Sequence, residues 1–133
     1  MKLSRTVEYA VQAVLQLAEH DRATPVPCSQ LAHRGKMPER FLLQILRNLV
    51  THRILSSTRG VDGGYALERA PDEITLLDVI EAVDGPLQGS QTVTHGMPPE
   101  AQRRLTAALD EVTTATRVRL AAIRMSSLIA PRE

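Results

Sequence analysis

An arginine followed by three glycines within five positions marks the segment 57-STRGVDGGYAL-67. Loops rich in glycine can cradle phosphate groups in enzymes, or they can let the tip of a hairpin approach DNA closely. The glycines have neither the GxxxxGK[ST] spacing of a phosphate-binding loop nor the GxGxxG spacing of a dinucleotide-binding loop. Both motifs also need a following helix, whereas residues 65–67 have the character of a strand. A tight hairpin is the plainest interpretation, and a basic finger whose Arg59 reaches the minor groove of DNA is the functional one.

A second set of polar residues shares one face of the helix predicted over residues 38–52. Arginine, glutamine and asparagine can read guanine and adenine edges in the major groove through paired hydrogen bonds. The arginines could instead hold phosphates, which positions a protein on DNA without specifying a sequence. An ordinary solvated helix face is the simpler alternative, and the glycine loop downstream favours the DNA-binding one. The residues on this face are Arg40, Gln44, Arg47, Asn48 and Thr51.

Hydrophobic periodicity predicts the elements that would position these residues. Residues 3–19 form an amphipathic helix, which two prolines then end. A short helix over 28–34, with Gly35 as its C-terminal stop, leads through a tight turn into helix 38–52. Two strands, 54–58 and 65–69, flank the glycine loop. The order of helix, helix and hairpin is that of a winged helix-turn-helix domain.

The remaining chain is predicted to be helical around one loop. Residues 75–85 form a helix, residues 86–97 a loop, and a long helix runs from Pro98 to about Leu128. At 1.5 Å per residue the long helix would span roughly 45 Å, more than the width of so small a domain. Its far end therefore needs another surface, which a second copy would supply. The apolar stripe assigned to this interface is Leu105, Leu109, Val112, Thr116, Leu120 and Ile123.

Length and composition are those of a single domain with an aliphatic core, because 43% of the 133 residues are hydrophobic and 2% are aromatic. Residues 1–69 carry ten Lys/Arg and six Asp/Glu, whereas residues 70–133 carry six and nine. A basic first half is compatible with a polyanionic partner. The expected fold is mainly α with a small β-hairpin wing. Residues 1–85 are the DNA-binding domain with its wing at 54–68, and residues 98–133 are the dimerisation helix and tail.

Several classes of protein are disfavoured. One cysteine allows neither an intramolecular disulfide nor a cysteine-based metal site. The absence of a long apolar run or a signal-peptide core predicts a soluble cytoplasmic protein without a membrane partner. We do not expect an enzyme, because the sequence offers no pairing of a nucleophile with a base.

Five collinear segments resemble the Rrf-two (Rrf2) family of bacterial winged-helix regulators, the family of IscR, NsrR and CymR. The resemblance implies a homodimeric transcription factor, usually a repressor, that binds a double-stranded DNA operator. The helix at 38–52 would enter the major groove, the wing would touch the minor groove, and the long helix would build the dimer. The segments are 3-LSRTVEYAVQAVLQLA-18, 26-VPCSQLAHR-34, 38-PERFLLQILRNL-49, 57-STRGVDGGYAL-67 and 77-LDVIEAVDGP-86.

Carried over position by position, the resemblance implies that Gln44 reads bases and that Arg59 and Gly60 contact the minor groove. Lys2 and Arg5 fall in an N-terminal segment that can approach the DNA backbone. The complete set of predicted DNA-binding residues is Lys2, Arg5, Ser29, Arg40, Gln44, Arg47, Asn48, Thr51, Arg59, Gly60, Gly63 and Gly64.

Two departures from the family pattern matter. Many members have a glutamate before the glutamine of the recognition helix, where this sequence has Leu43. A carboxylate can accept from cytosine N4, whereas leucine can make only apolar contact, so a different operator is expected. Cluster-binding members also place three cysteines in the loop before the long helix, and residues 87–105 contain none. Because His95 cannot hold a cluster alone, we expect no cofactor.

The regulatory signal is left open. Cys28 could be a redox sensor, since a helix N-terminus acidifies a thiol, but a structural thiol is the plainer interpretation. A small-molecule or protein effector could occupy a cavity between the long helix, residues 75–85 and the loop. The alternative function is a protein-interaction module on a winged-helix scaffold with weak or no DNA binding.

Overall fold

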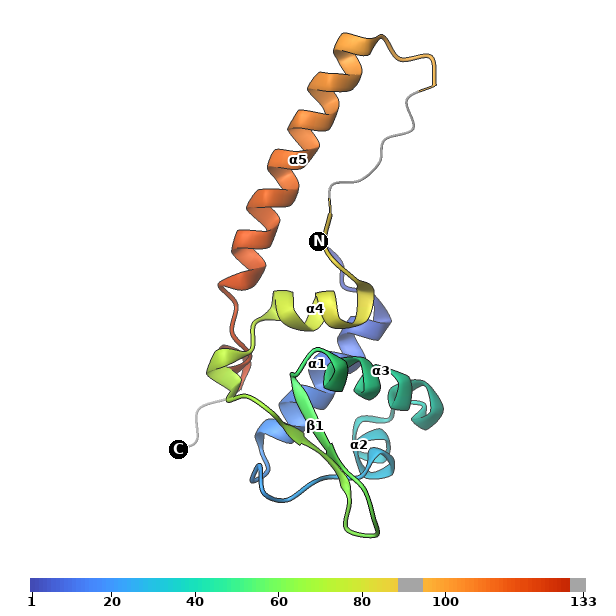
Figure 1. The fold of residues 1–133 in the computed structure, drawn as a ribbon, viewed down its shortest axis with the longest axis vertical. Helices are drawn as coiled ribbons and strands as arrows, with labels where there is room; N and C mark the ends of the chain where they lie inside the picture. The colour runs from blue at the N-terminus through green and yellow to red at the C-terminus, as the bar shows by residue number, and fades with distance from the viewer. Residues whose placement is uncertain (89–94, 130–133) are drawn as a thin grey trace.

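The computed structural model describes residues 1–88 and 95–129 (Figure 1). The fold is mainly helical with one antiparallel hairpin, which confirms the expected class. The middle of the expected loop and the end of the expected tail lie outside the described residues. The elements are α1 (Arg5–Ala18), α2 (Cys28–Gly35), α3 (Glu39–Thr51), β1 (Leu55–Thr58), β2 (Gly64–Leu67), the 3-10 turn η1 (Pro71–Glu73), α4 (Leu76–Asp84), α5 (Pro99–Ala121) and the 3-10 turn η2 (Met125–Leu128).

The helix-turn-helix is built on one aliphatic core. Leu42, Leu46 and Leu49 of α3 are fully buried, and they pack with α1, α2 and the start of the hairpin. Burying one such side chain is worth about 1.5–3 kcal/mol relative to leaving it in water. Because these residues recur every three or four positions, they fix the rotation of α3 and expose the opposite face.

Gly35 has a different role from the expected one. It is the last residue of α2, and the left-handed residue after the helix is Lys36, with φ 52°. A Cβ on Gly35 would lie 2.6 Å from Met37 Cε and 3.0 Å from the side chains of Gln12 and Gln16. Gly35 therefore ends α2 without the left-handed conformation of a helix stop, and a Cβ there would displace only the flexible ends of these side chains.

The segment before α2 anchors strand β2 of the hairpin. Leu55 pairs with Leu67 and Thr58 with Gly64, which is close to the predicted strands. Val26 and Tyr65 exchange backbone hydrogen bonds of 2.9 and 2.8 Å, so residue 26 extends the sheet by one bridge. This bridge attaches the hairpin to the turn that begins the helix-turn-helix.

The long helix is shorter than the sequence predicted. It ends at Ala121, so its 23 residues span about 35 Å at 1.5 Å per residue. The chain then turns back toward the body. The amide of Leu76 donates to the carbonyl of Ile123 (2.8 Å), the amide of Met125 donates to that of Ile74 (2.8 Å), and Met125 is fully buried. These tertiary contacts outweigh the helical periodicity of residues 122–128.

The base of α5 is fixed to α4, while the rest of the helix projects away from the body, opposite in direction to the hairpin (Figure 1). Leu120 is buried with Val7, Leu77 and Ile80 in a second small core. Farther along, Arg117 Nη1 lies 2.6 Å from a carboxylate oxygen of Glu81. The hydrogen bond from Arg117, the largest cause, holds the pKa of Glu81 below its usual value.

Side chains join α4 to α5 at the described part of their junction, and an effector site beside it stays a prediction. Glu81 also accepts from the amide of Leu87 (2.8 Å), and Arg117 donates to the carbonyl of Leu87 (3.1 Å). Ile123 packs against the second core as well. An apolar cluster and an ion-pair network thus fill this corner.

Candidate nucleic-acid interface

The outward face of α3 carries the polar residues that the sequence predicted. Arg40, Gln44, Arg47 and Thr51 are exposed, and Asn48 is half-buried at the edge of the face. Gln44 Nε2 donates to Asn48 Oδ1 (3.4 Å), so the two amides are oriented together. The amide oxygen of Gln44 is then available as an acceptor, together with its second amide hydrogen as a donor.

Leu43 adjoins this polar face but is half-buried. Its side chain offers only apolar contact beside Gln44. The pattern of donors and acceptors on α3 therefore lacks the carboxylate that a glutamate would supply at this position.

The tip of the hairpin presents Arg59 and Gly60 to solvent. Gly60 has φ 111°, and among the described residues no atom lies within 4 Å of where a Cβ at this position would be. Glycine at residue 60 thus serves backbone conformation, and the open space leaves room for another molecule. The amide of Gly63 donates to the carbonyl of Gly60 (3.0 Å) and closes the turn.

Gly63 and Gly64 instead serve the internal packing of the wing. A Cβ on Gly64 would overlap the backbone of Val26, and one on Gly63 would overlap the carbonyl of Thr58. Gly64 also has φ 152°, which other residues rarely adopt. Both glycines are half-buried, so their first effect is on the position of the wing.

An open groove of about 660 Å³ separates the C-terminal half of α3 from the wing. Two guanidinium groups and several hydroxyls border it, which are donors suited to the phosphates of a DNA strand. The groove therefore brings Arg47 and Thr51 of α3 together with the wing, whereas Arg40, Gln44 and Asn48 lie outside its lining. Its lining residues are Pro27, Cys28, Arg47, Val50, Thr51, Ser57, Thr58, Arg59, Gly60, Gly63, Gly64 and Tyr65.

Tyr65 keeps its proton in this groove. Burial is the largest cause of its raised pKa, the nearby Cys28 raises it further, and Arg47 opposes both. The phenol is therefore a hydrogen-bond donor at neutral pH.

Other predicted residues lie outside the lining of the groove. Lys2 and Arg5 are exposed at the start of α1, where the neighbouring Ser4 Oγ donates to a carboxylate oxygen of Asp84 (3.1 Å) at the end of α4. Ser29 is exposed in the first turn of α2. Contact with DNA stays a prediction for these three residues, as it does for the residues of α3 and the wing.

Cys28 lies at the first position of α2, but its thiol is not acidified there. Its Sγ is 3.7 Å from the carbonyl oxygen of Glu39. Burial first, and then the negative charge of Glu39, raise the pKa of the thiol. This direction is opposite to the acidification that the redox-sensor alternative needs, and a structural thiol stays the plainer interpretation.

The stripe predicted for dimerisation divides into two parts. Leu120 is buried and Ile123 half-buried against the protein's own α4 and α1. Leu105 and Val112 are exposed, at 36% and 61%, and Leu109 and Thr116 are half-buried. The outer four residues are therefore the part of the stripe that a second molecule can reach.

Sequence reasoning missed Arg22, which supports the wing from the turn before α2. Its Nε donates to the carbonyl of Leu67 (3.0 Å), and a second guanidinium nitrogen donates to the carbonyl of Glu68. A single arginine in a proline-containing turn carries no pattern that predicts these contacts.

Within residues 1–88 and 95–129, no cluster of three or more His, Cys, Asp or Glu side chains could hold a metal ion. In the same part of the chain, no helix combines the length and the apolar character that a membrane span needs.

The arrangement of helices, hairpin and basic groove defines a winged helix-turn-helix DNA-binding protein. Residues 3–131 match the family profile Rrf2, described as "Iron-dependent Transcriptional regulator". Rv1287 of Mycobacterium tuberculosis H37Rv, named as an HTH-type transcriptional regulator, is 37% identical over 130 residues, covering 98% of this chain and 80% of the relative. The regulator IscR of Sodalis glossinidius is 32% identical over 127 residues, covering 86% and 77%.

Solved structures agree with these relatives. CymR, the global cysteine regulator of Bacillus subtilis, superposes with a TM-score of 0.76 at 25% identity, covering 96% of this chain and 95% of CymR. IscR of T. potens gives a TM-score of 0.71 at 28% identity, covering 96% and 85%. The chain belongs to the Rrf2 family. It is a DNA-binding transcriptional regulator and not an enzyme.

The donor set of this chain does not fit the iron–sulfur cluster of some family members. Such clusters are held by several cysteine thiolates, with histidine replacing cysteine in some. The 133 residues contain one cysteine, and its half-buried thiol lies beside the Glu39 carbonyl at the helix-turn-helix. The single thiol of this chain therefore does not supply the donor set of such a cluster.

Proposed function

We propose that the protein is a homodimeric, sequence-specific repressor that acts in the bacterial cytoplasm without a cluster. Helix α3 of each copy enters the major groove, and each wing reaches the adjoining minor groove. The observation that carries this proposal is the shared groove, to which α3 contributes Arg47 and Thr51 and the wing contributes Arg59 and Gly60. One DNA strand fits between the two elements, with its phosphates facing the guanidinium groups.

Gln44 is the base-reading residue of this proposal. It is exposed at the middle of the outward face, and its contact with Asn48 orders its amide. Adenine N6 and N7 match one amide oxygen and one amide hydrogen. Arg40 and Arg47 flank Gln44 and either hold phosphates or read guanine, and Leu43 selects a thymine methyl nearby.

The second copy docks on the outer part of α5. Leu105, Leu109, Val112 and Thr116 recur at steps of four, three and four residues, so they share one side of α5. This helix leaves the body of the protein (Figure 1). A two-fold axis between paired α5 helices would present two copies of α3 to half-sites about one DNA turn apart. Occupation of a promoter by such a dimer is enough to block transcription, and an effector would act by changing the spacing of the two α3 helices.

A gel shift with DNA from upstream of its own gene tests this proposal. We expect retardation by the parent chain, and weakened binding after Gln44→Ala or Arg59→Ala. Gln88→Ala is the matched control for glutamine, since Gln88 is exposed beyond the end of α4. Unchanged affinity of both variants would overturn the assignment. Absence of retardation at low salt, with another protein co-purifying, would favour a protein-interaction module.

A further inference from the structure

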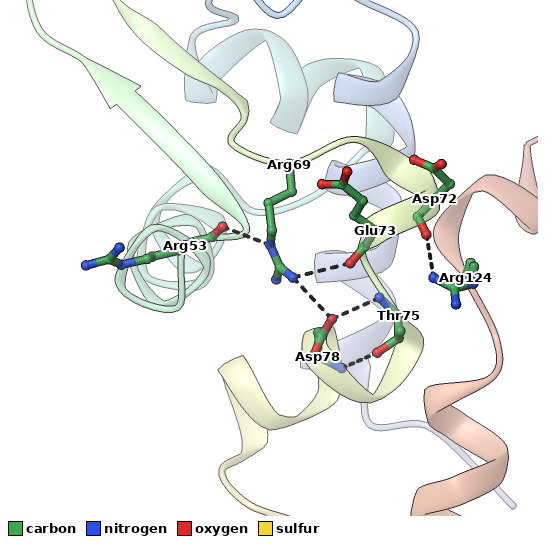
Figure 2. A network of polar contacts seen from close by, with 7 residues as sticks. All are labelled: Arg53, Arg69, Asp72, Glu73, Thr75, Asp78 and Arg124. Atoms are coloured by element: carbon green, nitrogen blue, oxygen red, sulfur yellow. Dashed lines mark hydrogen bonds and ion pairs between the residues drawn. The ribbon is translucent and has the colours of Figure 1, made fainter.

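Arg69 follows β2 and is the centre of a polar network that joins the wing to three other elements (Figure 2). Its Nε donates to the carbonyl of Arg53 (3.2 Å), at the junction between α3 and β1. Its Nη1 donates to the carbonyl of Glu73 (3.3 Å) and lies 3.6 Å from Asp78 Oδ2. One guanidinium group therefore links the base of the wing, the end of α3, η1 and the start of α4.

The carboxylate that Arg69 meets is itself fixed in place. Asp78 accepts from the amide of Thr75 (3.0 Å) and its own amide donates to Thr75 Oγ1 (3.1 Å), which is the capping box of α4 (Figure 2). The side chains of Arg69 and Asp78 are 34% and 38% exposed. Because these capping bonds fix the Asp78 carboxylate, its ion pair with Arg69 holds the arginine at the start of α4.

The other partner of Arg69 is the backbone of Arg53, in a strained turn between α3 and β1. Arg53 has φ 58°, a left-handed conformation that is uncommon outside glycine. Just beyond it, the amide of Glu68 donates to the carbonyl of Ile54 (3.0 Å), which closes the base of the hairpin. The Arg69 guanidinium therefore binds the carbonyl from which the wing leaves α3.

The same turn carries the chain that returns from α5. Thr75 forms a bridge with Arg124, whose Nη1 donates to the carbonyl of Asp72 (2.7 Å) (Figure 2). One connected set of bonds thus joins the segment after α5 to the base of the wing, through Thr75, Asp72 and Arg69. A planar guanidinium can hold two carbonyls and a carboxylate at once, which a lysine ammonium on a flexible stem does less well.

We infer that Arg69 is a positioning residue for operator binding, an inference that rests on the proposed function. It holds the base of the wing against the end of α3 and the capped start of α4. In this position Arg59 reaches the minor groove while α3 occupies the major groove. Loss of Arg69 lets the wing swing relative to α3, so the contribution of Arg59 to binding falls although Arg59 itself is intact.

A double-mutant cycle on operator affinity separates this role from general stabilisation. Fluorescence anisotropy would measure the dissociation constants of the parent, Arg59→Ala, Arg69→Ala and the double variant, all shown to be folded by circular dichroism. We expect Arg59→Ala to weaken binding roughly tenfold in the parent and less than about threefold in the Arg69→Ala background. Arg69→Lys should restore only part of this difference.

The control is Arg103→Ala, which removes the same charge from an exposed ion pair with Glu100 on α5. In that background the cost of Arg59→Ala should stay near its value in the parent. If Arg69→Ala fails to fold, Asp78→Asn removes the ion pair while keeping an oxygen that can cap α4, and it should lower the cost of Arg59→Ala in the same way.

Three outcomes decide the inference. A reduced cost of Arg59→Ala in the Arg69→Ala or Asp78→Asn background supports it. An unchanged cost in both backgrounds overturns the role of Arg69 while leaving the proposed function intact. If the parent itself binds no DNA, the proposed function fails and this inference fails with it.

Discussion

The winged helix-turn-helix and the α5 arm differ in where their apolar faces are buried. Of the 13 residues in α3, four are buried against other elements of the same domain. Of the 23 residues in α5, all of which the structure describes, Leu120 alone is buried. Isolated helices are marginal in water, and tertiary packing supplies most of their stability in proteins. The winged helix-turn-helix is therefore packed within one chain, whereas most of α5 (called the arm below) is not, which is why we propose that a second copy covers it.

The core beneath α3 should show the largest effect on stability. Leu46 is fully buried, so Leu46→Ala should lower the free energy of unfolding by about 2–5 kcal/mol. Urea denaturation followed by circular dichroism would measure this loss. A change below about 1 kcal/mol would show that this core is looser than its burial indicates.

Two of the three wing glycines, Gly60 and Gly64, offer a sharper comparison within the winged helix-turn-helix. Gly64→Ala meets the Val26 backbone at φ 152°, and we expect a loss of about 2–3 kcal/mol from overlap and strain. Gly60→Ala, at φ 111° with open space around it, should lose only about 1 kcal/mol. Thermal unfolding of the pair tests this order, and equal losses would contradict a packing role for Gly64.

Substitutions on the outer part of α5 should weaken dimerisation while leaving the stability of a single chain nearly unchanged. Val112 is 61% exposed on the outer stripe, so Val112→Asp should leave the fold of a single chain intact. Placing a charge in the paired interface should raise the dimer dissociation constant at least about tenfold, or 1.4 kcal/mol. Sedimentation equilibrium would measure this constant.

Val118→Asp provides the control for the arm. Val118 is 66% exposed and lies roughly 120° around the helix from Val112, at 3.6 residues per turn. Its substitution should leave the association constant nearly unchanged. Equal effects of the two substitutions would place the interface elsewhere on α5.

The smallest effect is expected at the junction between α4 and α5, where acid should slightly lower the free energy of unfolding. The pKa of Glu81 is lowered chiefly by Arg117, so the folded state binds its proton less readily than the unfolded state. The stabilisation is present above the unfolded pKa of about 4.3 and is lost as pH falls through the lower folded value. Because the pair is partly exposed, we expect less than about 1 kcal/mol.

Unfolding curves between neutral and acidic pH would measure that loss, with Glu81→Gln as the comparison. The variant should show a weaker decline of stability over the same range. An identical decline in both proteins would mean that other carboxyl groups account for it.

Most of the fold could be predicted because each helix carries its own apolar period. The apolar stripe of α3 predicted which of its side chains face outward. The glycines predicted the turn that joins the two strands of the hairpin. The end of α5 could not be predicted in this way. Ile123 continues the helical period, but the backbone groups of Ile74 and Leu76, far away in sequence, bind that segment in another conformation.

The candidate site was predictable to the extent that it depends on solvent-facing side chains. Arg47 and Arg59 line one groove, as the order of elements indicates. The supporting contacts of Arg22 and Arg69 are side-chain bonds to distant backbone carbonyls, and no sequence spacing encodes them. The thiol of Cys28 shows the same limit, since its pKa depends on burial and on Glu39 across the turn.

Hydroxyl-radical cleavage of a bound operator tests the central claim most directly, because it reports minor-groove contact along each strand. The account predicts a two-fold symmetric pattern with one protected minor-groove site for each wing, and loss of both sites after Arg59→Ala. It also predicts that Gln44→Ala keeps the symmetry while reducing occupancy. Protection confined to one half of the operator, or a pattern that survives Arg59→Ala, would contradict it.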